Sequence, residues 1–177
     1  MKNWLFCFVL LQVTATCLAQ PATIEIDQQV SSINKRIEKG LLSKWSYQSE
    51  EEEKSEEVIE GGTREEMISY VDDKSLVLCD YTFAGAYNTS RTQIWFHNEQ
   101  PIFVLQEQAD FMIDSRQIEK IWIKDGAFTK WQLHNSDIHE ENTYEDVANG
   151  QTERIKKLNS LVGYIRILQA ESKVQTP

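Results

Sequence analysis

Two stretches in the middle of the chain carry the same hairpin pattern, and this repeat limits the fold more than any other feature. Residues 94–98 read Ile-Trp-Phe-His-Asn, residues 121–125 read Ile-Trp-Ile-Lys-Asp, and a turn and a second apolar run follow each. The Asp125-Gly126 pair between apolar runs is typical of a two-residue hairpin. Because the pattern occurs only twice, it favours an antiparallel meander over a solenoid or propeller, which need more repeats.

Helical patterns flank this region. Apolar residues recur at helical spacing over residues 23–42 and again towards the C-terminus, where Thr143 and Asp146 form a capping pair that predicts a helix start. Strands are predicted over residues 67–71, 76–83, 92–97, 102–106, 118–124 and 128–133. The expected class is therefore α+β: an N-terminal helix, an antiparallel β-meander of about five to seven strands and a C-terminal helix. We expect both helices to shield one face of the sheet and to leave the other open.

The N-terminus has the pattern of a secretory signal. Lys2 precedes an apolar run over residues 4–13, and small residues suit cleavage before Gln20. This predicts a signal peptide over residues 1–19, a single domain over residues 20–177, and a secreted or periplasmic location. Lipid attachment at Cys17 is the less favoured alternative, because Thr14 and Thr16 fit a lipobox poorly. No stretch is long and apolar enough to predict a membrane span.

Charge excludes some classes of partner. The chain has 28 acidic and 18 basic residues, for a net charge of −10. Such a chain repels phosphate backbones and anionic lipids, so nucleic-acid binding is not expected. The acidic run over residues 49–57 is interpreted as a solvated loop. Cys79, the one cysteine beyond the signal, lies in an apolar run and is expected to be a buried thiol rather than a nucleophile.

Evidence for catalysis is weak. The sequence contains no nucleophile elbow, phosphate-binding glycine loop or zinc-binding helix motif. The polar segment over residues 134–141 holds His134, Asp137 and His139, which are metal-capable ligands without a diagnostic spacing. We therefore assign no catalytic residue, metal or cofactor, and keep a small hydrolase or metal-dependent enzyme using this segment as the alternative.

The tryptophans of the predicted strands are the candidate binding residues. Trp95, Trp122 and Trp131 are flanked by residues that alternation places on the opposite face. On an open sheet face such side chains could bind sugar rings, a peptide or a partner protein. The competing interpretation is that they point inward and stabilise the sheet through cross-strand pairs. The preferred function is non-enzymatic binding of an unidentified ligand or partner.

At its two hairpins the sequence resembles a loose set of small uncharacterised exported bacterial proteins. The matching stretches are residues 94–103 and 121–131, and the match extends over roughly residues 90–133. Glu99 stands where glycine is usual, so the first turn is expected to differ. The resemblance implies an exported β-meander and no particular activity. A helix followed by strands also suits an inhibitor module of cystatin type, although no inhibitory loop can be recognised.

Overall fold

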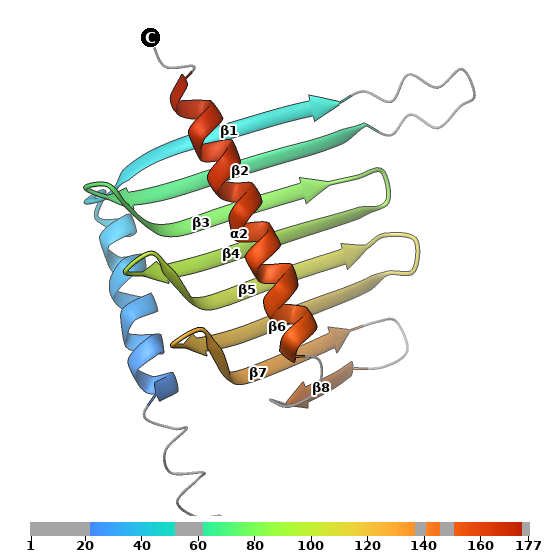
Figure 1. Cartoon of the computed structure of the whole chain (residues 1–177). Coiled ribbons are helices and arrows are strands. Elements are labelled where there is room, and N and C mark those ends of the chain that lie inside the picture. The colour runs from blue at the N-terminus through green and yellow to red at the C-terminus, as the bar shows by residue number, and fades with distance from the viewer. Residues whose placement is uncertain (1–21, 52–61, 137–140, 146–150, 175–177) are drawn as a thin grey trace, which may run out of the picture.

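The computed structural model describes residues 22–51, 62–136, 141–145 and 151–174 (Figure 1). A helix over residues 22–38 precedes the sheet, and helix α2 (Gln151–Val174) follows it. The strands between them are β1 (Ser43–Glu51), β2 (Thr63–Asp72), β3 (Ser75–Ala84), β4 (Asn88–His97), β5 (Gln100–Asp110), β6 (Ser115–Lys124), β7 (Ala127–Ser136) and β8 (Glu141–Glu145).

The strands form one antiparallel sheet in which every strand pairs with its neighbours in sequence, in the order β1 to β8. The α+β class and the meander are thus confirmed. The sheet has eight strands, more than the five to seven predicted. The additional strands are β1, which begins before the acidic run, and β8, which lies in a polar stretch without an apolar alternation. Pairing with β7 makes residues 141–145 a strand, so the predicted helix start at Thr143 is wrong and α2 begins at Gln151.

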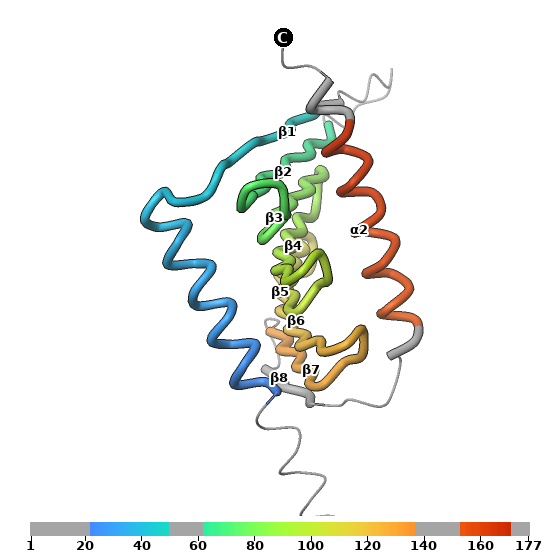
Figure 2. The backbone as a smooth tube through the Cα atoms, turned by 60° about the vertical axis from the view of Figure 1, so that its left-hand side comes forward, coloured from blue at the N-terminus to red at the C-terminus, as the bar shows by residue number. Residues whose placement is uncertain are grey.

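The two helices lie on opposite faces of the sheet, so the expectation of one open face is wrong (Figure 2). Helix α2 runs obliquely across one face and the N-terminal helix covers part of the other. The central strands explain this arrangement, because their apolar residues are consecutive rather than alternating. Ile94 and Phe96 pack in the cluster under α2, whereas Trp95 packs in the cluster under the N-terminal helix. A run that is apolar on both faces needs a cover on both sides.

The repeated hairpins share one geometry. Each has a register shift directly after its Trp, between Trp95 and Phe96 and between Trp122 and Ile123. Both turns also have two residues with positive φ: 50° and 63° at Asn98 and Glu99, and 53° and 75° at Asp125 and Gly126. Two positive φ values are the requirement of a type I′ turn, whose twist matches that of the strands. Glu99 therefore adopts the backbone conformation that glycine adopts in the second hairpin, and the expected difference between the turns is absent.

Candidate functional site

The structure divides the three candidate tryptophans between the two faces. Trp95 and Trp122 lie under the N-terminal helix, with 4% and 7% of their surface exposed, and Trp131 lies under α2 with 7% exposed. They do not form a single exposed row, because Trp131 pairs with Ile121 and so faces the opposite side from Trp122. Most of each ring is therefore buried against the sheet and its helix, as the competing interpretation predicts.

The indoles of Trp95 and Trp122 tie the N-terminal helix to the sheet. Trp95 Nε1 donates to Asn34 Oδ1 at 2.9 Å, and Trp122 Nε1 donates to Asp27 Oδ1 at 2.7 Å. Phe103 lies between the two, with ring centroids 5.3 Å from Trp95 and 5.1 Å from Trp122. Offset aromatic contacts at these distances are favourable beyond the area they bury. The three rings form a fixed aromatic floor beneath the helix.

A groove of about 630 Å³, here called the helix-side groove, opens beside this floor. The N-terminal helix forms one wall, and the half-buried side chains of Tyr70 and Leu105 continue the floor onto the uncovered part of the sheet. Its charged lining residues are Asp27, Glu38, Asp80, Arg91 and Lys120. The groove therefore combines ring and aliphatic surface with several polar groups, the composition typical of ligand sites.

A hydrogen-bonded network fixes part of that polar lining. Arg91 donates through Nε and a terminal nitrogen to the two oxygens of Asp80, and Gln93 Nε2 donates to Asp80 Oδ2 at 2.9 Å. The hydrogen bonds from Arg91 to the carboxylate raise the pKa of this guanidinium. Sequence reasoning missed these residues. Gln93 and Arg91 stand two and four residues before Trp95, so strand alternation alone places all three on one face.

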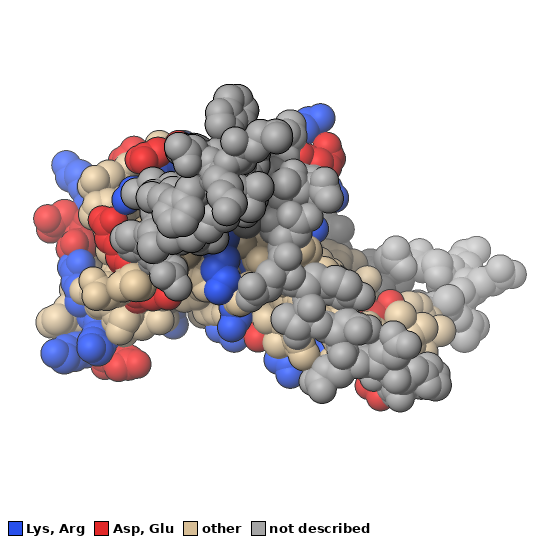
Figure 3. Space-filling view, turned by 90° about the horizontal axis from the view of Figure 1, so that it is seen from below, with Lys and Arg blue, Asp and Glu red and all other residues tan. Residues whose placement is uncertain are grey.

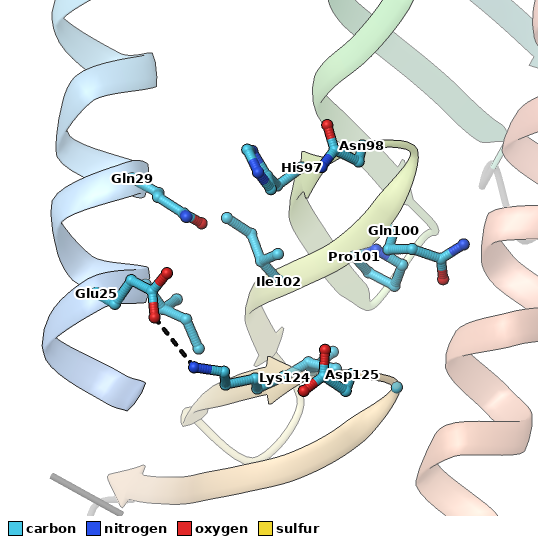
Figure 4. Close-up of a pocket in the computed structure, with 12 residues that line it drawn as sticks. Glu25, Gln29, His97, Asn98, Gln100, Pro101, Ile102, Lys124 and Asp125 are labelled. Atoms are coloured by element: carbon cyan, nitrogen blue, oxygen red, sulfur yellow. Dashed lines mark hydrogen bonds and ion pairs between the residues drawn. The ribbon is translucent and has the colours of Figure 1, made fainter. Parts of the chain in front are cut away.

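A second hollow of about 480 Å³, the hairpin-end recess, lies on the other side of the N-terminal helix (Figure 4). Glu25 and Gln29 reach it from the helix, and His97, Ile102 and Lys124 reach it from the two repeated hairpins. Lys124 Nζ lies 3.1 Å from Glu25 Oε2, which joins helix and hairpin across the mouth. Both partners are about half exposed, so this ion pair contributes little to stability.

Among the residues that the structure describes, the remaining candidates form no catalytic arrangement. Cys79 is fully buried, as expected, and burial raises the pKa of its thiol to about 12. His134 lies half-buried on β7, while Asp137 and His139 are outside the described residues. Within the described ranges there is no group of three His, Cys, Asp or Glu residues able to hold a metal ion. Of the acidic run 49–57, the described residues 49–51 belong to β1, which corrects the loop prediction for these three.

One side of the described surface carries charges of both signs. Viewed from below, Asp and Glu side chains are interspersed with Lys and Arg side chains (Figure 3). Neither helix, over its described residues, has the length and apolar character needed to cross a bilayer. No family model, curated protein or solved structure matches this chain.

Proposed function

We propose that this chain is an exported, non-enzymatic protein that binds a ligand or partner in the helix-side groove. The observation that carries the proposal is the aromatic floor of Trp95, Phe103 and Trp122, which is held in place by the helix and borders an open groove. Export is inferred from the N-terminal pattern of residues 1–19.

Preorganisation supports binding at this groove. Its aromatic floor is fixed by two indole hydrogen bonds, and its Asp80–Arg91–Gln93 network is already formed. A site whose side chains are already ordered loses less conformational entropy when it binds. The half-buried side chains of Tyr70 and Leu105 offer the apolar surface that a ligand would cover.

The test uses the dye 8-anilinonaphthalene-1-sulfonate, which brightens in apolar sites, as a reporter of groove occupancy. We expect one dye to bind per chain and to be displaced by compounds that take the groove. Leu105→Ala is expected to weaken dye binding. Ile118→Ala is the matched control, because Ile118 is a half-buried aliphatic residue on the same sheet face that does not line the groove.

Equal weakening by the two substitutions, or dye binding without a defined stoichiometry, would contradict the proposal. A panel of fatty acids, peptides and oligosaccharides tested for dye displacement then sorts the ligand classes.

A further inference from the structure

A third hollow lies on the opposite face of the sheet from the helix-side groove. Helix α2 crosses this face obliquely and leaves the ends of β3, β5 and β7 uncovered (Figure 1). The hollow there has a volume of about 490 Å³, and we call it the amide recess. Each of its five central residues stands four positions along its strand from a core residue under α2, which places it on that face. These central residues are Phe83, Ser90, Gln108, Gln117 and Asn135.

The central residues form one continuous row across five strands. Strand register pairs Phe83 with Ser90, Ser90 with Gln108, Gln108 with Gln117, and Gln117 with Asn135. Gln117 Nε2 donates to Asn135 Oδ1 at 2.9 Å, which fixes the orientation of both amides. Neighbouring polar groups in such a row lie close enough to contact one small molecule together.

The lining is almost free of charge, although charged residues make up 26% of the chain. Seven of the eleven lining residues carry an amide or a hydroxyl, and Asp110 is the one charged residue among them. The Asp110 carboxylate already accepts a hydrogen bond from the backbone N–H of Met112 at 2.9 Å. By contrast, the helix-side groove and the hairpin-end recess each contain several charged residues. The lining therefore holds no positive group that would attract an anion.

One aromatic side chain lines the recess, and two more belong to the loops next to it. Phe83 belongs to its lining, and the exposed rings of Tyr87 and Phe111 adjoin the lining residues Asn88 and Asp110 in sequence. Tyr87 and Phe111 are 46% and 63% exposed, and the Phe111 N–H donates to the Tyr87 carbonyl at 2.9 Å. This hydrogen bond joins the β3–β4 and β5–β6 loops. Large apolar side chains gathered at an exposed loop indicate a contact surface.

We propose that the amide recess binds a neutral oligosaccharide. Sugar hydroxyls both donate and accept hydrogen bonds, as do the amides and hydroxyls of the recess. The apolar faces of sugar rings suit an aromatic side chain, which Phe83 supplies within the lining. This site is separate from the helix-side groove, which lies on the other face, so either site can be tested without the other.

The experiment measures binding of the full chain to maltohexaose, cellohexaose, laminarihexaose, xylohexaose and chitohexaose by titration calorimetry at millimolar ligand. An oligogalacturonate of the same length serves as the charged comparison. We expect at least one neutral hexaose to bind, and Gln108→Ala, Gln117→Ala and Asn88→Ala each to weaken it by about tenfold. Gln48→Ala, an exposed amide on β1 outside the recess, is the matched control and should leave binding unchanged.

Circular dichroism and thermal melting confirm that each variant is folded before its affinity is interpreted. Asn88 is the exposed first residue of β4, so its variant remains informative even if a substitution further along a strand perturbs the sheet. The proposal is overturned if none of the five neutral sugars binds, if the recess variants bind as tightly as the unaltered chain, or if the oligogalacturonate binds equally well. Leu105→Ala, which alters the other groove, should not change sugar affinity, so failure of one proposal is distinguishable from failure of the other.

Discussion

The indole N–H of Trp122 on β6 donates to the carboxylate of Asp27 on the N-terminal helix, 95 residues earlier in the chain, at 2.7 Å. The pair joins the helix to the sheet where the aromatic floor begins. Removing the acceptor would leave the N–H of a buried indole without its protein partner, which costs more than a typical hydrogen bond contributes.

We therefore expect Asp27→Ala to lower the free energy of unfolding by about 1–2 kcal/mol. Urea denaturation followed by circular dichroism measures this change. Gln28→Ala, at an exposed neighbouring position of the same helix, is the control and should have little effect. Equal stability of the two variants would show that the indole finds water as an adequate acceptor.

The two type I′ turns give a prediction about backbone strain. Glu99 adopts a φ of 63°, which is unfavourable for a residue with a Cβ, whereas Gly126 at the equivalent turn position has a φ of 75°. Glu99→Gly should stabilise the protein by about 0.5–1 kcal/mol, since glycine adopts this conformation without strain. Gly126→Ala should destabilise it by about 1 kcal/mol although the added Cβ has open space around it. Thermal melting tests both, and shifts in the same direction would contradict the assignment.

The contact between α2 and Trp131 gives a third prediction. The Arg154 guanidinium lies 3.9 Å from the centroid of the Trp131 ring, and its Nε lies 3.4 Å from Glu119 Oε1, which also accepts from the Trp131 indole. Arg154→Leu removes both the cation–π contact and the ion pair, and should cost about 1 kcal/mol.

Lys156→Leu, at an exposed position of the same helix, is the matched control for Arg154→Leu, because both substitutions remove one positive charge. Urea midpoints compare the two variants. If they differ by less than the error of measurement, the stacked geometry contributes nothing beyond ordinary surface contact.

Because the Cys79 thiol is buried, we expect the protein to lose stability at alkaline pH. Burial raises its folded pKa to about 12, from an unfolded value of about 8.5. Between these values the unfolded thiol loses its proton and the folded thiol keeps it, so stability falls as pH rises, by about 1.4 kcal/mol per pH unit. Burial and the nearby Glu65 carboxylate also raise the pKa of Tyr81, which acts in the same direction at higher pH.

Cys79→Ala removes the thiol contribution and should flatten the fall in stability above pH 9, although the missing sulfur lowers stability at neutral pH. Thiol labelling provides a second measurement. The unaltered chain and Cys79→Ala should take up equal label in native buffer and differ by one label per chain in urea. A difference in native buffer would show that the thiol is accessible.

Strand and helix periodicity predicted the meander, the flanking helices and the burial of Cys79, because these features follow from local spacing. The same rules missed β1 and β8, whose polar edge sequences become strands through pairing with a neighbour. Local spacing also could not place Asn34 against Trp95 or Asp27 against Trp122, which lie 61 and 95 residues apart.

The amino-acid sequence determined which residues are apolar and at what period, and this set the two helices, the central strands and their order. It also carried an overlooked indication of two-sided burial, in the consecutive apolar residues Ile94-Trp95-Phe96 and Ile121-Trp122-Ile123. Only the tertiary structure decided which helix covers which face, because an amphipathic helix pattern specifies that one side is buried but not what buries it. That choice divided the tryptophans between two faces and left both the helix-side groove and the amide recess uncovered.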